Sequence, residues 1–405
     1  MRPTVGIVCE YDPFHRGHAR QFALVREALP EARIVCAMSG CFTQRGMPAL
    51  FAPAFRAQAA LRAGASLVLE LPCAFAVREA ENFALGAVGL LDSLGFVTHL
   101  SFGCETANLP LLTRIATLLE EPAPAYTAAL KAALAEGRPF AQAQALAAVE
   151  AFAQAQASAE TDAHPLDADD LAQTLRTPNN ILAICYLRAL RRLRSPILLL
   201  PVVREGAYHA ATLDAEGYPS ASATRAAYLR GDLPAAEAAC GYSLAGALHH
   251  PPTALDPALI DLLRRMPPEA LRALPDCSEG LENRLQRAAR QAATRRELLA
   301  ALKTRRYAYA RLNRLATHAL LGVTAQLLRD YPLPPYARLL GFDPADREAL
   351  ALLKQGGLPV LAKAAHGDAQ NPLYALDARA YDLWALGAGL PAGLMYRQAP
   401  VQPNG

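Results

Sequence analysis

Residues 5–20 read V-G-I-V-C-E-Y-D-P-F-H-R-G-H-A-R, and this stretch decides the fold. It opens with an apolar run of five residues, which a turn containing Pro13 ends. His15 and His18 follow, with Gly17 between them, and a helical pattern begins at once. A buried strand that leads directly into a helix leaves unpaired backbone N–H groups at the helix N-terminus, where phosphate binds readily. The stretch therefore predicts a strand, turn and helix with an anion site at the turn.

The two histidines are the first candidates for catalysis. Three residues apart, they share one face of the first helical turn, so both can contact the same phosphoryl group. There they would stabilise the charge that builds up during its transfer. Two histidines in a turn are by themselves more often solvated than catalytic. The strand before them and Gly17 inside the motif favour catalysis, so we expect His15 and His18 to be the catalytic residues.

Further apolar runs alternate with helical patterns along the first half of the chain. The runs lie at 33–37, 66–71, 97–102 and 197–203, and the helical patterns lie near 17–29, 54–63, 80–94 and 179–194. Buried parallel strands read as continuous apolar runs, and alternation with helices implies crossover connections. We expect an α/β fold, a Rossmann-like doubly wound parallel sheet, with the first strand central.

The rest of the chain predicts helices. Residues 108–175 are rich in alanine, leucine and glutamine, which favours a helical insert. After Arg225 we expect no further strand–helix alternation, because helical patterns are broken only by proline pairs. The division expected from this is a catalytic domain at 1–235 and a mainly helical domain at 236–405.

Composition limits the class of protein. Of the 405 residues 53% are hydrophobic, yet no uncharged run is long enough to span a membrane. The sequence enters a strand pattern without a basic and then apolar leader, so we expect no signal peptide and a cytoplasmic location. The eight cysteines include no C-x-x-C pair, so neither a zinc site nor a disulfide framework is expected.

The motif H-x-G-H resembles the signature of the nucleotidyltransferase superfamily. A longer set of segments resembles the tRNA(Met) cytidine acetate ligase family over nearly the whole chain; these segments are residues 10–18, 38–46, 69–72, 101–105, 178–182, 220–225, 282–284 and 303–307. The resemblance implies a nucleotidyltransferase-type fold. It also implies that ATP, with Mg²⁺, and acetate form an acetyl-adenylate, from which the N4 amine of the wobble cytidine of elongator tRNA(Met) is acetylated.

By the same resemblance, the first strand and its turn should bind ATP together with a few residues further along. The expected ATP-binding residues are Ile7, Val8, Cys9, Glu10, Tyr11, Asp12, Pro13, Phe14, His15, Arg16, Gly17, His18, Ala19, Arg20, Gly103, Asn179, Asn180 and Arg204. One asparagine of the pair after Pro178 is expected to cap a helix, since Asn commonly does so. We favour Asn180 for the nucleotide, but Asn179 stays open.

A hydroxyl-rich segment, residues 220–225, reads S-A-S-A-T-R and precedes a helical pattern. Its hydroxyl and N–H groups can bind a leaving pyrophosphate, with the arginine as counter-charge. A helix cap formed by Ser222 or Thr224 is an equally good explanation. We expect pyrophosphate contacts from Ser222, Thr224 and Arg225.

A basic cluster marks the second half of the chain. Residues 282–314 contain ten basic and two acidic residues, interleaved with two tyrosines. Such a cluster suits a phosphate backbone, and tyrosines can stack on unpaired bases. The expected tRNA-binding residues are Arg284, Arg287, Lys303, Arg305, Arg306, Tyr307 and Arg311. Four arginines at 188, 191, 192 and 194 form a second possible patch.

Two other functions fit parts of this pattern. A small-molecule adenylyltransferase, acting on a phosphopantetheine or mononucleotide acceptor, would share the H-x-G-H motif but would not need a long basic helical half. A non-catalytic RNA-binding protein would keep the basic cluster but would not need the intact motif.

Overall fold

One sheet organises the molecule. The computed structural model describes residues 2–106, 108–138, 140–158, 168–203, 218–278, 280–304 and 307–404. In these residues seven strands form a single sheet in the order β5-β4-β1-β2-β3-β6-β7. The strands are β1 (Thr4–Cys9), β2 (Arg33–Ser39), β3 (Leu67–Leu71), β4 (His99–Cys104), β5 (Leu198–Val203), β6 (Ala337–Phe342) and β7 (Val360–Leu361). The five strands expected from the apolar runs are confirmed, and β1 is the middle one of them.

The strands are apolar because helices cover both faces of the sheet. Strand β2 is buried at every position. Its alternate residues Ile34, Cys36 and Met38 join one hydrophobic core, whereas Val35 and Ala37 join another. The first core includes residues of α1 (Arg16–Ala28) and α2 (Pro53–Arg62), and the second includes residues of α4 (Ala80–Ser93) and α9 (Pro178–Leu193). Burial on both faces is what makes parallel strands read as unbroken apolar runs.

Parallel pairing places the functional ends of the strands together. Strands β1 and β2 pair in parallel with Cys9 opposite Met38, and β4 pairs in parallel with β1 and with β5. The carboxyl ends of all five parallel strands therefore meet at one edge of the sheet. Ligands of open α/β sheets bind at this edge, near the strand where the order reverses. Strand β1 is that strand.

The expectation of no further strand–helix alternation after Arg225 is wrong, because β6, α18 (Arg347–Gln355) and β7 follow one another within the mainly helical second half. Strand β6 pairs antiparallel with β3, and β7 pairs in parallel with β6. The apolar pattern did not predict strand β6 because its second residue, Arg338, is charged, although only 5% of it is exposed. Arg338 pairs with Glu70 of β3, and its Nε donates to the Glu70 carboxylate at 2.7 Å. Glu70 is thus neutralised within the fold.

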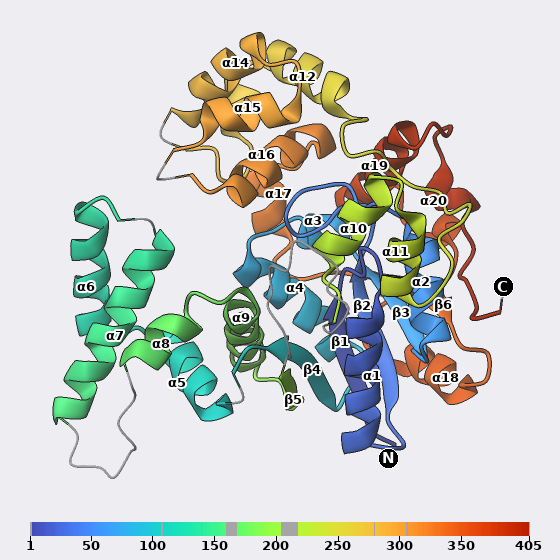
Figure 1. Cartoon of the computed structure of the whole chain (residues 1–405), viewed down its shortest axis with the longest axis horizontal. Coiled ribbons are helices and arrows are strands. Elements are labelled where there is room, and N and C mark those ends of the chain that lie inside the picture. Colours follow the sequence, from blue (N-terminus) through green and yellow to red (C-terminus); the bar gives the residue numbers. More distant parts are fainter. Residues whose placement is uncertain are drawn as a thin grey trace.

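The helices surround this sheet in three groups (Figure 1). The helical insert extends to one side and comprises α5 (Leu109–Glu120), α6 (Pro124–Ala135), α7 (Phe140–Ser158) and α8 (Ala168–Thr174). A group that we call the helical lobe stands above the sheet and comprises α12 (Asp256–Arg265), α13 (Pro268–Arg272), α14 (Leu281–Gln291), α15 (Arg295–Leu302), α16 (Tyr309–Leu321) and α17 (Ala325–Asp330). The remaining helices pack near the sheet and are α3 (Cys73–Ala76), α10 (Ala221–Leu229), α11 (Leu233–Cys240), α18 (Arg347–Gln355), α19 (Pro372–Gly387) and α20 (Leu394–Arg397), with a 3₁₀ turn η1 (Ala364–His366).

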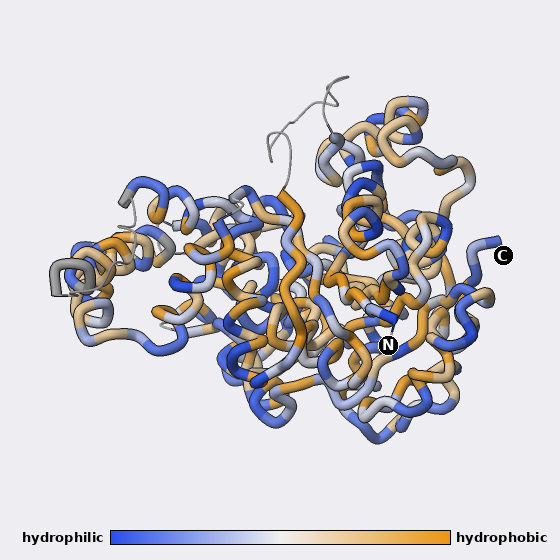
Figure 2. The backbone as a smooth tube through the Cα atoms, turned by 90° about the horizontal axis from the view of Figure 1, so that it is seen from below, coloured by the Kyte–Doolittle hydropathy of each residue, from blue (hydrophilic) through white to orange (hydrophobic). Residues whose placement is uncertain are grey.

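Hydropathy follows this layering. In Figure 2 hydrophobic stretches gather towards the middle of the molecule, whereas the outer segments alternate between hydrophobic and hydrophilic residues. Such alternation is typical of helices that bury one face only. In the described part of the chain, no helix combines the length and apolar character that crossing a bilayer requires.

A buried histidine joins the helical lobe to the end of α3 and makes stability depend on pH. His318 of α16 is 2% exposed, and its Nε2 lies 2.7 Å from the Val77 carbonyl oxygen. Burial lowers the pKa of His318 to about 4. The unfolded chain, with an ordinary histidine pKa near 6.5, then binds the proton first, so stability present at neutral pH is lost as the pH falls from 6.5 towards 4.

We therefore expect His318→Gln to flatten the acid side of the stability profile. Between pH 7 and pH 5 this group should lower the free energy of unfolding by about 2 kcal/mol. Urea unfolding at several pH values measures the difference between the variant and the unmodified chain. The exposed His366 is the matched control, and His366→Gln should leave the profile unchanged. Identical profiles for His318→Gln and the unmodified chain would show that His318 titrates normally.

Candidate active site

The turn after β1 is built by the two histidines themselves. His15 is the N-cap of α1, and its Nδ1 accepts from the Gly17 backbone N–H at 3.1 Å. His18 reaches back, and its Nδ1 accepts from the His15 N–H at 3.2 Å. Together they form a capping box, in which two imidazoles take the places usually held by a hydroxyl and a carboxylate. The helix start and the candidate catalytic pair are therefore one structure.

This capping decides what the imidazoles can donate. The rings stack with centroids 3.8 Å apart and an angle of 23° between their planes. Because each Nδ1 accepts a hydrogen bond, the proton of each neutral ring resides on Nε2. Two Nε2–H donors thus lie side by side at the β1–α1 turn. Such an arrangement suits the oxygens of a phosphoryl group.

Gly17 is required by the closeness of the first ring. A Cβ atom at this position would lie 2.9 Å from Cε1 of His15 and 3.0 Å from its Nδ1. Any larger residue would displace the imidazole that caps the helix. The glycine in H-x-G-H is therefore explained by packing against the first histidine.

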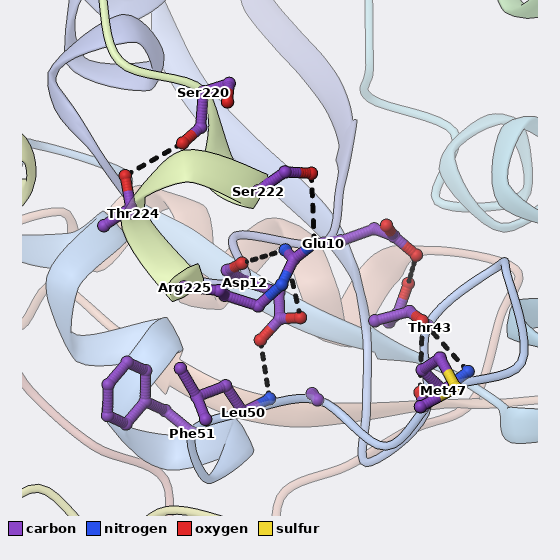
Figure 3. A network of polar contacts seen from close by, with 12 residues as sticks. Glu10, Asp12, Thr43, Met47, Leu50, Phe51, Ser220, Ser222, Thr224 and Arg225 are labelled. Carbon is purple, nitrogen blue, oxygen red and sulfur yellow. Dashed lines mark hydrogen bonds and ion pairs between the residues drawn. The ribbon is translucent and has the colours of Figure 1, made fainter. Parts of the chain in front are cut away.

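Two carboxylates flank the turn, and one loop fixes both. The loop between β2 and α2, residues 41–51, is called the active-site loop below. Its Gln44 N–H donates to Glu10 at 2.5 Å, and its Leu50 N–H donates to Asp12 at 2.7 Å. Figure 3 shows Asp12 between Leu50 and Arg225. The Arg225 guanidinium donates to the Asp12 backbone carbonyl oxygen at 2.5 Å. Burial raises the pKa of Glu10.

A buried arginine binds the same strand ends from below. Arg56 of α2 is fully buried. Its guanidinium donates to four backbone carbonyl oxygens, those of Glu10, Ser39, Gly40 and Phe51. These oxygens come from the ends of β1 and β2 and from the active-site loop. Arg56 thus holds together the segments that carry the turn, and it places a positive charge beneath them.

These groups line a cavity of about 660 Å³ at the carboxyl edge of the sheet. Its side nearest β4, β5 and α9 is mainly apolar and includes Phe102, Ile181, Leu182, Tyr186, Val202 and Val203. Its side nearest β1, α10 and the active-site loop is polar and includes Glu10, Asp12, His15, His18, Gln44, Arg45, Ser222 and Arg225. A cavity with an apolar end and a polar end suits a nucleotide, whose base is flat and apolar and whose phosphates are charged.

Most of the predicted ATP-binding residues line this cavity. Those that do are Val8, Cys9, Glu10, Tyr11, Asp12, His15, Gly17, His18, Arg20, Gly103 and Asn179. Those in the described chain that do not are Ile7, Pro13, Phe14, Arg16, Ala19 and Asn180. Ile7 and Phe14 are core residues instead, and Arg16 points to solvent. Arg204 lies outside the described residues.

Neither asparagine of the pair caps the helix, because the N-cap of α9 is Thr177, and Asn179 rather than the favoured Asn180 lines the cavity. Asn180 is 2% exposed, and its Oδ1 accepts from the N–H groups of Glu105 and Thr106 at 2.9 and 3.3 Å. Its Nδ2 donates to Thr177, so the side chain is fully used in holding the β4 end against α9. Asn179 lines the cavity. Of the two, Asn179 is the one placed to contact a nucleotide.

The residues of the hydroxyl-rich segment also differ in their positions. The N-cap of α10 is Ser220, not Ser222 or Thr224, and it accepts from the Ala223 N–H. Thr224 is fully buried, lies outside the cavity lining, and donates its hydroxyl back to Ser220 (Figure 3). Ser222 and Arg225 line the cavity and contact each other at 3.2 Å. The expected pyrophosphate contact from Thr224 is therefore wrong as a matter of geometry.

Sequence reasoning missed the loop that closes the polar end. Thr43, Gln44, Arg45, Met47, Pro48 and Leu50 all line the cavity. The family resemblance included residues 38–46, so part of this loop could have been singled out from the sequence. No local pattern indicated, however, that these residues line the cavity. His250 and Pro252 also line the cavity. They lie beside the bridge between Phe51 and His249, where the His250 N–H donates to the Leu50 carbonyl oxygen at 2.7 Å.

Nucleophilic catalysis by a cysteine finds little support here. Cys9 lines the cavity, but burial raises the pKa of its thiol well above the ordinary value, so a nucleophilic thiolate is disfavoured. Among the residues that the structure describes, no three His, Cys, Asp or Glu side chains come together as a metal site would require.

The predicted RNA-contacting residues have mixed positions on the helical lobe. Arg287 is exposed on α14, whereas Arg284, Lys303 and Arg311 are half-buried. Tyr307 is only 5% exposed and packs under Arg311, so its expected role in base stacking is wrong for this state. Tyr309 is the exposed aromatic side chain, at 51%. Arg305 and Arg306 lie outside the described residues.

Most of the second basic patch is paired within the protein. Arg188, Arg191 and Arg192 of α9 form ion pairs with Glu81, Glu120 and Glu121 at 2.7–3.1 Å. Three of the four arginines are therefore compensated by glutamates, and the fourth, Arg194, is exposed at the C-cap of α9. The separation of α9 from the acidic α4 and α5 in the sequence hid this pairing.

The chain is similar to known proteins over most of its length. The family model described as HIGH Nucleotidyl Transferase matches residues 2–392. A protein named tRNA(Met) cytidine acetate ligase from Thermoanaerobacter sp. strain X514 is 35% identical over 370 residues, covering 89% of this chain and 88% of the relative. One of the same name from Clostridium perfringens strain SM101 is 33% identical over 387 residues, covering 94% of each. The crystal structure of Thermotoga maritima TmcAL bound with alpha-thio ATP superposes with a TM-score of 0.85 at 26% identity over 99% of each chain.

Proposed function

The chain belongs to the HIGH nucleotidyl transferase family, among relatives named tRNA(Met) cytidine acetate ligase, and on that premise we propose that it activates acetate with ATP and acetylates a tRNA cytidine. The observation that carries the proposal is the stacked His15–His18 pair in the polar end of a cavity whose other end is apolar. A nucleotide with its base at the apolar end has its phosphates beside the two imidazoles.

The order of the strands orients the substrates. The apolar end belongs to β4 and β5, which lie on one side of β1, and the active-site loop follows β2, which lies on the other side. The base would therefore sit over β4 and β5, the α-phosphate over the β1–α1 turn, and acetate towards the active-site loop. That loop contacts the helical lobe, so the acceptor side of the cavity faces the basic helices.

The proposed reaction has two displacements. An acetate oxygen attacks the α-phosphorus of ATP, and the bond to the bridging oxygen breaks, which releases pyrophosphate and leaves acetyl-adenylate. The N4 amine of the cytidine then attacks the acetyl carbonyl carbon, AMP leaves, and the amine loses a proton. The first step needs positioning and charge stabilisation more than acid–base catalysis. His15, His18, Ser222 and Arg225 are the described residues placed for it.

Mg²⁺ would enter with the nucleotide. Glu10 and Asp12 are the carboxylates at the polar end, but each already accepts a backbone N–H. Two such carboxylates suit a hydrated Mg²⁺ bound mainly by phosphate oxygens, because this ion keeps several of its waters. The ion would neutralise phosphate charge while His15 and His18 bind the transferring group.

A pyrophosphate exchange assay tests the first step. With ATP and labelled pyrophosphate, the protein should catalyse exchange only when acetate is present, and tRNA should not be required. Exchange that needs a phosphopantetheine or a mononucleotide instead of acetate would favour a small-molecule adenylyltransferase. No exchange with any acceptor, together with tight tRNA binding, would indicate a non-catalytic RNA-binding protein.

The RNA surface gives a separate prediction. Arg287 and Arg290 are both exposed on α14. Changing both to Gln should weaken tRNA binding and reduce the slope of log affinity against log salt by about 1 to 2, since each phosphate contact contributes roughly 0.7–0.9. Filter binding at several salt concentrations measures this slope.

The matched control uses arginines that already have partners. Arg191→Gln with Arg192→Gln removes two partly exposed charges that are paired with glutamates, so the salt slope should stay as in the unmodified chain. Equal slopes for the α14 variant and the unmodified chain would rule out phosphate contacts on that face of α14.

A further inference from the structure

The tip of the active-site loop is held by the helical lobe. The Gly46 carbonyl oxygen accepts from Arg295 of α15 at 3.0 Å and from the Thr317 hydroxyl of α16. Arg295 also contacts the Thr317 hydroxyl oxygen at 3.0 Å and the Met47 sulfur at 3.8 Å. Two helices that are about 250 and 270 residues away in the sequence thus meet at one peptide group of the loop.

The loop is shaped for this contact. Gly46 has a φ of 80°, a left-handed conformation that favours glycine. A Cβ atom there would lie 2.7 Å from the backbone nitrogen of Arg314 and 2.8 Å from its Cα. The tip therefore rests directly on the backbone of α16, with no room for a side chain between them.

The contact is costly for the helical lobe. Arg295 is 5% exposed and is the first residue of α15, where the helix dipole disfavours a positive charge. Burial lowers the pKa of Arg295 to about 10, and its second terminal nitrogen has no hydrogen-bond partner in the described residues. Folding of α15 alone does not require a buried cation at this place. Unfavourable features of this kind are typical of functional positions.

The loop transmits this contact to the site. Two residues before Gly46, the Gln44 N–H binds Glu10, and four residues after it, the Leu50 N–H binds Asp12. Glu10 and Asp12 lead into the turn that carries His15 and His18. Arg45 and Met47, on either side of the tip, line the polar end of the cavity. Fixing Gly46 therefore fixes the wall that faces the reacting phosphate.

We propose that Arg295 and Thr317 are positioning residues of the adenylation site, which hold the active-site loop in its reactive conformation from the helical lobe. The inference rests on the proposed function, because it assigns these residues to the step between ATP and acetate. It makes the helical lobe part of the catalytic machinery, in addition to its proposed contact with RNA.

The test begins with Thr317→Val, which removes the hydroxyl and keeps the shape of the side chain. We expect kcat for acetate-dependent exchange between ATP and pyrophosphate to fall by about tenfold or more. A small misplacement of groups at an active site lowers the rate to this extent. The KM for ATP should stay within about twofold, because the base end of the cavity is untouched. Thr317→Ser keeps the hydroxyl and should restore most of kcat.

Thr324→Val is the matched control for simple destabilisation. The Thr324 hydroxyl caps α17 in the same lobe, and it accepts from the Leu327 N–H at 3.1 Å. Its loss should lower stability by about 1 kcal/mol, as loss of a helix cap does, without changing kcat. A kcat loss in Thr317→Val no larger than in Thr324→Val would overturn the inference.

Gly46→Ala tests the contact from the loop side. It leaves Arg295 and Thr317 intact but forces the tip away from α16. If the two sides act through one contact, the double variant Gly46→Ala with Thr317→Val should lose little more kcat than either single variant. Losses that simply multiply would overturn the inference.

Hydrogen exchange gives a readout that does not depend on turnover. Residues 41–51 should exchange faster in Thr317→Val than in the unmodified chain or in Thr324→Val, since the Gln44 and Leu50 amides are held by this loop conformation. If the unmodified chain showed no acetate-dependent exchange between ATP and pyrophosphate, the proposed function alone would be overturned. Unchanged protection of residues 41–51 would overturn the positioning role alone.

Discussion

Replacing His18 by Ala should lower the rate of acetyl-adenylate formation by about 10² to 10³, the loss seen when one donor to a developing negative charge is removed. The physical reason is the fixed tautomer of the ring. His18 accepts at Nδ1 from the His15 N–H, so Nε2 carries the proton and can donate. Single-turnover formation of adenylate from ATP and acetate measures the rate, and tRNA affinity should be unchanged.

His15 needs a variant that separates its two roles. His15→Ala removes both the donor and the helix cap, whereas Asn is among the best N-cap residues and keeps an acceptor for the Gly17 N–H. We expect both variants to be equally slow, with His15→Asn more stable than His15→Ala by about 1 kcal/mol. Recovery of the normal rate in His15→Asn would mean that His15 acts only as a cap.

Replacing Arg56 by Met should lower the free energy of unfolding by about 4 kcal/mol or more, because each of four buried carbonyl oxygens that loses its donor costs about 1–3 kcal/mol. Four such oxygens depend on Arg56, and they come from β1, β2 and the active-site loop. Urea unfolding measures the change. Activity should fall with stability, since the same oxygens fix Glu10 and Gly40 beside the turn.

Two variants keep this prediction decisive if Arg56→Met folds poorly. Arg56→Lys keeps the charge but loses the planar fork that reaches four oxygens, so its loss should be intermediate. Arg62→Met lies on the exposed side of the same helix and should change stability by less than about 0.5 kcal/mol. Equal stability of the Arg56 and Arg62 variants would contradict the structural role of Arg56.

Local pattern was sufficient where one segment determines its own structure. The first strand, its turn and the capping histidines lie within residues 4–18, so neighbouring residues carry the whole signal. The five parallel strands were readable because burial on both faces makes them uniformly apolar. The same reasoning located the helical insert. The predicted nucleotide-binding residues that line the cavity came from the family resemblance instead, and they are a minority of its lining.

Local pattern failed where a distant partner changes what a residue can do. Arg338 hid β6 because its charge is cancelled by Glu70, which lies 268 residues earlier. Asn180 could not be separated from Asn179 because its partners, Glu105 and Thr106, lie across the insert. Tyr307 is buried by Arg311, and the arginines of α9 are neutralised by glutamates of other helices. Each of these depends on tertiary contacts that no periodicity encodes.

The central claim is that the cavity beside His15 and His18 activates acetate for transfer to a tRNA cytidine. The most direct measurement is the amount of N4-acetylcytidine in elongator tRNA(Met) after incubation with the protein, ATP and isotopically labelled acetate. We expect labelled acetylcytidine at the wobble position only when both ATP and acetate are present, and none with His18→Ala. Folded protein that binds the tRNA and ATP but leaves the cytidine unlabelled would contradict the account.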